Sequence, residues 1–131
     1  MRVEVYWNLH KKLWSIRALE GPDKGRVIGR FPDVWLTGCK MVVQPAGRDR
    51  VRRERKKNVH AFVRGTLDPG TSRWLHPSRR DMGRAFTYNP YRDDTFKRCK
   101  DDTPIHAATF VKLSSVGHDI RVPRCLAWEE A

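Results

Sequence analysis

The densest group of residues that could bind phosphate is the run RDRVRRERKK at residues 48–57. Seven of these ten residues are Arg or Lys, and only Asp49 and Glu54 are acidic. Guanidinium groups suit phosphates because their planar forks donate two hydrogen bonds at once, and they also stack on bases. The alternative interpretation is a solvated helix in which the two acids pair with arginines three or four residues away. The strong basic excess favours contact with a polyanion, because like charges repel one another.

A second basic segment follows at residues 68–84, DPGTSRWLHPSRRDMGR. Its Pro, Gly, Ser and Arg content predicts a long basic loop, and loops of this length are usually functional or mobile. Trp74 in this loop, with Tyr88 and Tyr91 beyond it, either stacks on single-stranded bases or anchors the loop. The chain has no helix-turn-helix, zinc-finger or RNP signature, so base-specific recognition is not supported. The predicted polyanion contacts are Arg48, Arg50, Arg52, Arg53, Arg55, Lys56, Lys57, Arg73, Trp74, Arg79, Arg80 and Arg84.

Two histidines offer an alternative, enzymatic chemistry. His60 and His106 each open an apolar stretch and could act as a general acid and a general base. The arrangement resembles that of two-histidine phosphoesterases, whose motif is His-x-Thr or His-x-Ser. Here the motifs read His60-Ala61-Phe62 and His106-Ala107-Ala108, and both lack the hydroxyl that would hold a phosphate. The other interpretation is that each histidine is structural.

A nuclease pattern can also be drawn. Pro32-Asp33, followed by Glu54-Arg55-Lys56, resembles the PD-(D/E)xK motif, in which two acids hold a metal ion and the lysine assists the attacking water. That family carries its second acid on a buried strand, whereas Glu54 falls in the most solvated run of this chain. We therefore favour a binding function over an enzymatic one.

No cofactor or metal is expected from the remaining residue types. The Cys and His residues do not have the spacing of zinc ligands. The chain has three cysteines, an odd number at long spacings. This pattern argues against a disulfide framework and fits a reducing compartment better. The residues of types that could ligate zinc are Cys39, Cys99, Cys125, His60, His76, His106 and His118.

The elements that must position these residues are mostly strands. Apolar and polar residues alternate in VEVYWN and LWSIRAL, which predicts a hairpin of strands about 3–8 and 13–19. Two more strands follow, RVIGRF and VWLTGCKMVVQ, and the four together suggest an antiparallel meander. Later strands are predicted in NVHAFVRGTL, around 84–88, and in PIHAATFVKLSS, with VGHDIRVP as its hairpin partner.

One short charged helix interrupts this pattern around 46–57. Pro45 precedes a run of helix-forming residues and suits the first position of a helix. Val51 is the only sizeable apolar residue of the run, so we expect no deep docking. The fold class predicted is mostly β (α+β), a single compact antiparallel sheet or a small barrel. Residues 1–131 are expected to form a single domain.

The charge of the whole chain agrees with a polyanionic partner. The net charge is +12, and residues 1–66 carry 16 Lys and Arg against 6 Asp and Glu. An excess of this size favours DNA, RNA or an acidic protein face. No apolar run approaches the roughly 18 residues of a membrane span, and the N-terminus lacks a signal-peptide core. The protein is expected to be cytoplasmic, without membrane contact.

A small, basic, Trp-rich chain with KNVHAFVRG in its middle resembles uncharacterised small proteins of tailed bacteriophages. The resemblance implies a context, a phage product in the bacterial host cytoplasm that acts against a host or defence factor. We therefore expect a small basic protein that binds nucleic acid or a host nucleoprotein complex. The alternative is a small phosphate-directed enzyme that uses His60 and His106. The sequence does not distinguish RNA, DNA and an acidic protein as the partner. It does not determine the oligomeric state either.

Overall fold

The computed structural model describes residues 1–8, 10–56, 59–68, 85–114 and 125–128. Its strands and single helix are β1 (Arg2–Asn8), β2 (Leu13–Ala18), β3 (Val27–Phe31), β4 (Asp33–Val43), α1 (Pro45–Glu54), β5 (Ala61–Leu67), β6 (Ala85–Thr87), β7 (Lys97–Arg98), β8 (Ala107–Ser114) and β9 (Cys125–Trp128).

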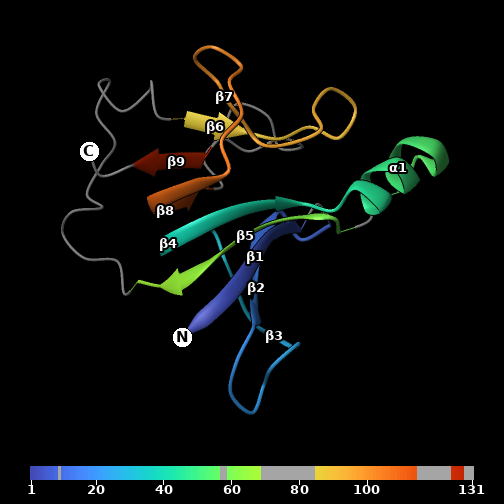
Figure 1. Cartoon of the computed structure of the whole chain (residues 1–131). Coiled ribbons are helices and arrows are strands. Elements are labelled where there is room, and N and C mark those ends of the chain that lie inside the picture. The colour runs from blue at the N-terminus through green and yellow to red at the C-terminus, as the bar shows by residue number, and fades with distance from the viewer. Residues whose placement is uncertain (9, 57–58, 69–84, 115–124, 129–131) are drawn as a thin grey trace.

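The described strands form one antiparallel sheet with β3 and β7 at its two edges (Figure 1). The strand order is β3-β2-β1-β5-β4-β8-β9-β6-β7, and every pairing is antiparallel. The prediction of a mostly β fold is confirmed. The sequence predicted either a single sheet or a small barrel. The structure shows an open sheet, because β3 and β7 do not pair in the described part of the chain.

The predicted first hairpin is confirmed. Val3 and Val5 are fully buried on the core face of β1, and Val5 lies opposite Ile16 of β2. On the same face Trp7 lies edge-on against Trp14, with ring centroids 5.0 Å apart. Alternation determines the register here, because a slip of one residue would move every apolar side chain to the other face.

The predicted meander is wrong at its fourth strand. β3 pairs with β2, but β4 pairs with β5 on one side and with β8 on the other. The cause is the apolar content of β4, whose buried Val34, Leu36 and Met41 require a central place in the sheet. Between Thr37 and Lys40 the register shifts, and Gly38 adopts a φ of +58° that favours glycine.

The later strands lie close to their predicted positions. β5, β6 and β8 fall within the predicted segments 58–67, 84–88 and 104–115. The predicted hairpin partner at 116–123 lies outside the described residues, as does the loop from 69 to 84. In the described part β8 pairs instead with β9, a strand that the sequence pattern did not indicate.

The helix begins at Pro45 as predicted but ends sooner. Arg55 adopts a left-handed conformation with φ 55°, and its N–H bonds to the carbonyl of Val51. This arrangement satisfies a carbonyl that the end of the helix would leave open. Arg55 and Lys56 therefore lie beyond the end of the helix. The predicted span of 46–57 was correctly placed but extended too far.

Candidate nucleic-acid interface

Helix α1 lies beyond the end of β4 and the start of β5, and it is fixed there along one side. The chain leaves β4 to form α1 and comes back as β5, and the Gln44 N–H donates to the carbonyl of His60 at 2.7 Å across the base of this excursion. A Cβ placed on Gly47 would lie 2.6 Å from the Cβ of His60, so the helix backbone approaches β5 more closely than alanine would allow. Val51 is buried one turn later. The helix therefore has a fixed inner side in spite of its charge.

One predicted contact residue, Arg48, belongs to this inner side. Its Nε donates to the backbone carbonyl of Asp93 at 2.6 Å. The carboxylate of Asp93 is buried and accepts hydrogen bonds from the Asn89 N–H and the Arg92 side chain. Lys97 lies 3.8 Å from the same carboxylate. Arg48 thus joins α1 to the loop after β6, and its guanidinium supports the helix.

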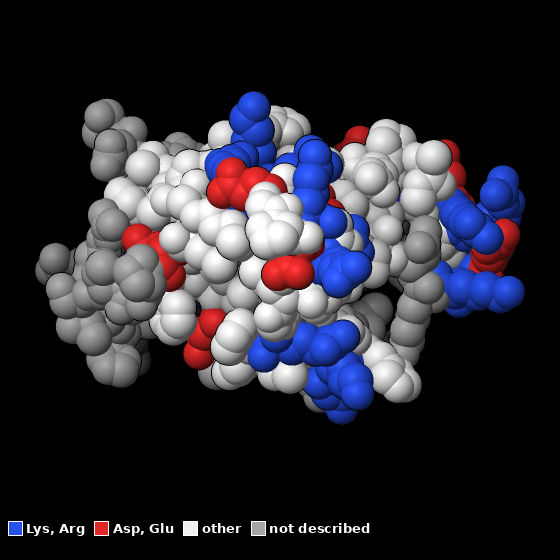
Figure 2. Space-filling view, turned by 90° about the horizontal axis from the view of Figure 1, so that it is seen from below, with Lys and Arg blue, Asp and Glu red and all other residues white. Residues whose placement is uncertain are grey.

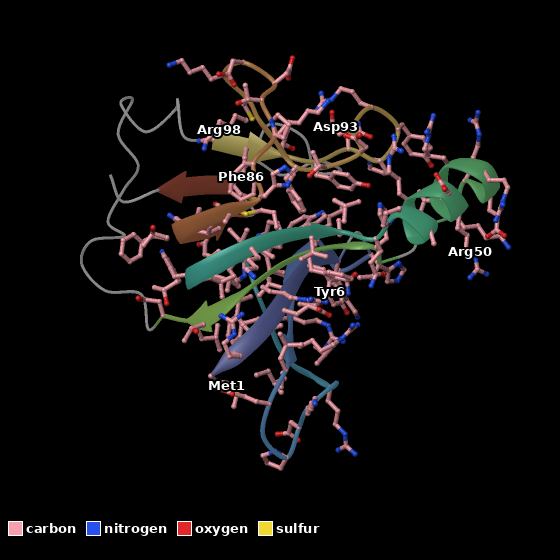
Figure 3. All side chains as sticks on the ribbon, in the orientation of Figure 1. Met1, Tyr6, Arg50, Phe86, Asp93 and Arg98 are labelled. Atoms are coloured by element: carbon pink, nitrogen blue, oxygen red, sulfur yellow. The ribbon has the colours of Figure 1, made fainter. Side chains whose placement is uncertain are left out.

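The outer side of α1 carries exposed charge. Arg50 pairs with Glu54 at 3.1 Å, an i,i+4 pair that contributes little to stability at the surface. Arg52 and Arg53 are exposed, and within the described residues they take part in no ion pair. Arg55 and Lys56, beyond the end of the helix, are exposed as well. Basic side chains gather over α1 at the right of Figure 2, and Figure 3 labels Arg50 among them.

Six residues of the predicted interface lie outside the described part of the chain. They are Lys57, Arg73, Trp74, Arg79, Arg80 and Arg84. The described portion of the predicted interface is therefore the helix and the two residues that follow it.

The two aromatic residues near Asn89 have different environments. The Tyr88 hydroxyl lies 2.7 Å from Nε2 of His60, and the Tyr88 ring packs against Phe96 of the core. Burial raises the pKa of this tyrosine well above its usual value, an effect that nearby Arg48 partly opposes. Tyr91 is 57% exposed. Tyr88 is thus an anchor, whereas Tyr91 faces solvent.

The two histidines considered for catalysis lie on opposite sides of β4. The His60 carbonyl accepts from Gln44 and the His106 carbonyl accepts from Met41, at the β5 and β8 edges of that strand. His60 is buried beside Tyr88, whereas His106 is exposed. The structure places them in separate environments, which does not favour a catalytic pair.

The acids of the nuclease-like pattern also lie apart. Asp33 is the first residue of β4, and Glu54 lies in the helix that follows the other end of that strand. Eleven residues of strand span roughly 30 Å. No group of three or more potential metal-ligating side chains comes together among the residues the structure describes.

A charged row across the sheet was missed by the sequence analysis. Its members lie opposite one another on neighbouring strands: Arg17 faces Glu4, Glu4 faces Arg64, and Arg64 faces Lys40. Opposite residues on paired strands project from the same face of a sheet. We call this set, Arg17, Glu4, Arg64 and Lys40, the Arg17 row. The sequence pattern gave no sign of which of these charged residues would meet.

Glu4 is the centre of the Arg17 row. It is 5% exposed, and its two carboxylate oxygens each accept a hydrogen bond, one from Arg17 and one from Arg64, at 3.1 Å. Each guanidinium also lies near an aromatic ring. The Cζ of Arg17 is 5.3 Å from the centre of the Tyr6 ring, and that of Arg64 is 5.9 Å from the centre of Phe62. Both arginines are therefore held in place.

Comparison with known proteins identifies the family. Residues 1–120 match the family described as Mycobacterium phage L5 gene 82 protein. The "Gene 82 protein" of Mycobacterium phage L5 is 46% identical over 123 residues, which cover 89% of this chain and 93% of that protein. The chain therefore belongs to a bacteriophage protein family, as the resemblance indicated. That family is the Mycobacterium phage L5 gene 82 protein family.

No solved structure matches the chain. Among the described residues, no helix has the length and apolar character needed to cross a membrane.

Proposed function

We propose that the protein binds nucleic acid through the outer side of α1 and acts on nucleic acid or a nucleoprotein complex in the cytoplasm of the bacterial host. The observation that carries this proposal is a helix fixed on its inner side by Gly47, Arg48 and Val51 that presents Arg52 and Arg53 to solvent. Because the helix backbone is already fixed, these side chains can reach phosphates without first ordering the segment that carries them.

Charge supports a polyanion as the partner. The chain carries a net charge of +12, and most of the excess lies in its first half. Each phosphate that a cationic side chain neutralises releases counterions, so affinity falls steeply as salt rises. The family assignment adds the context of a phage product. Such a protein could act on the host by binding its nucleic acid or by occupying the nucleic-acid channel of a host enzyme.

The test is the salt dependence of binding to fluorescent RNA and DNA oligonucleotides, measured by anisotropy between about 50 and about 200 mM salt. Arg52→Gln/Arg53→Gln should reduce the slope of log K against log salt by about 1.8, or 0.9 for each phosphate contact. Lys24→Gln/Lys100→Gln removes the same charge from two exposed turns and is the matched control.

Two results would contradict the proposal. One is an unaltered salt slope in the Arg52/Arg53 variant. The other is equal binding of poly-glutamate with the same dependence on these arginines, because that would indicate an acidic protein face as the partner.

A further inference from the structure

The arrangement of the Arg17 row goes beyond what stability requires. One arginine would neutralise Glu4, yet Arg17 and Arg64 both bind it, and Lys40 adds a third cation. Replacing a buried ion pair with apolar residues is often neutral or stabilising, so the row is weak evidence of a stabilising device. Within the described residues, three cations and one acid leave the Arg17 row with a charge of +2.

The two guanidinium groups keep donors for such a partner. A guanidinium has five N–H donors, and each of these arginines uses one on Glu4. Their side chains are 32% and 42% exposed for Arg17 and Arg64, respectively, while Glu4 beneath them is covered. The aromatic rings and the shared carboxylate restrict their rotamers, so little side-chain entropy is lost on binding. They form a preorganised pair of anion-binding groups.

The spacing of the pair suits a phosphodiester backbone. β1 separates β2 from β5, so Arg17 and Arg64 begin about 10 Å apart, two strand spacings. Both guanidinium groups bind the one carboxylate of Glu4, so they converge to less than this separation and suit neighbouring phosphates of one strand. The exposed Lys40 extends the row by one more strand toward β4.

The Arg17 row is also close to α1. The Lys40–Arg64 pair and the Val43–Ala61 pair are separated by three residues along β4 and β5, a distance of about 10 Å. The chain enters α1 two residues after Val43. Figure 3 labels Tyr6, whose ring lies beneath the guanidinium of Arg17, and Arg50 on the helix. Figure 2 shows basic side chains in several groups across the middle of this face and a further group at the right, over α1.

We propose that the Arg17 row is a second phosphate-contacting surface, so that one nucleic-acid backbone runs from α1 over β4 and β5 to Arg17. This inference rests on the proposed function of α1. It assigns Arg17, Arg64 and Lys40 to the interface and leaves Glu4 as the residue that positions the two guanidinium groups.

The test must remove the arginines without leaving a buried carboxylate. Glu4→Gln/Arg17→Gln/Arg64→Gln does so, because three amides can replace the ionic hydrogen bonds. Lys100→Gln lowers the net charge by the same single unit at the opposite end of the strand order and is the matched control. Urea denaturation selects conditions in which both variants are fully folded.

The triple variant should bind a 20-nucleotide DNA or RNA about 10-fold or more weakly than wild type, with a salt slope reduced by roughly 2, while Lys100→Gln stays close to wild type. An unaltered slope in the folded triple variant, together with a reduced slope in Arg52→Gln/Arg53→Gln, would overturn the second surface and leave the helix as the interface. An unaltered slope in the helix variant would instead overturn the proposed function.

A charge-conserving variant separates geometry from charge. Arg17→Lys/Arg64→Lys keeps Glu4 paired and the net charge constant but loses the planar forks. It should bind more weakly than wild type, with a salt slope close to wild type. Wild-type affinity in this variant would overturn the claim that the two guanidinium groups act as a preorganised pair.

Discussion

Nε2 of His60 lies 2.7 Å from the hydroxyl of Tyr88, a hydrogen bond that joins the start of β5 to the segment after β6. Their rings meet edge-on, with centroids 5.5 Å apart. Burial raises the pKa of the Tyr88 hydroxyl above its usual value, so the hydroxyl keeps its proton further into the alkaline range. Because Gly47 lies on His60, this pair supports the platform on which the basic helix sits.

Tyr88→Phe should lower the free energy of unfolding by about 1–2 kcal/mol, because it removes a hydrogen bond from a buried ring. Urea denaturation measures the change. Tyr91→Phe is the matched control, and it should change stability by less than about 0.5 kcal/mol because Tyr91 is exposed. Equal effects of the two substitutions would show that the His60 contact contributes nothing.

Gly47→Ala should destabilise the protein although it replaces glycine in a helix. By propensity alone the change would stabilise an exposed helix by about 1 kcal/mol. Here the added Cβ would lie 2.6 Å from that of His60, and overpacking of this kind costs about 1–3 kcal/mol. Thermal unfolding decides the sign, and a raised Tm would contradict the close approach of α1 to β5.

The ionic contacts of Glu4 should be strongly non-additive. Arg17→Gln/Arg64→Gln leaves a buried carboxylate without its two cations and should cost about 3–5 kcal/mol. Adding Glu4→Gln should recover most of the lost stability, since no buried charge remains. A double-mutant cycle measured by urea denaturation gives the coupling free energy, and additive effects would mean that the carboxylate is solvated.

Stability should fall as pH rises above about 9, in part because of Cys39. Burial raises the pKa of its thiol from 9.0 to about 12, and the charge of Arg2 opposes this only in part. Below pH 9 both states keep the proton. Between pH 9.0 and about 12 the unfolded state releases it and the folded state does not, so unfolding becomes easier by up to about 1.4 kcal/mol per pH unit.

Comparison of wild type with Cys39→Ala in urea, at several pH values from about 8 to about 11, isolates this contribution. The variant should lose stability less steeply with pH, whatever its stability at neutral pH. Burial also raises the pKa of Cys125 and Tyr88, which act in the same direction and keep some slope in the variant. Parallel curves for the two proteins would contradict a protonated thiol in the folded state.

Local patterns predicted the elements well where one face of a strand is apolar. The alternation of Val3, Val5 and Trp7 was enough for β1, and Pro45 marked the start of α1. The place of β4 could not be predicted in this way. Its partners β5 and β8 are distant in sequence, and alternation constrains the face of a strand but not its neighbour.

The candidate site shows the same division. The exposed arginines of α1 were predicted from composition, because a dense cationic run stays in solvent. The structural role of Arg48 depends on Asp93, which lies 45 residues away. Glu4 likewise meets Arg64 from 60 residues away. Contacts of this kind depend on strand order, so no local pattern indicates them.

The closed base of the α1 excursion, where Gln44 bonds to His60, has a consequence for the kinetics of association. With both flanking strands paired to each other, the helix that carries the arginines is already in place when a partner arrives, so capture requires no slow rearrangement of the backbone. The association rate constant should then be set by electrostatic steering and should fall as ionic strength rises. Encounters would be fast, and residence time would depend on how many phosphates the rigid surface contacts at once.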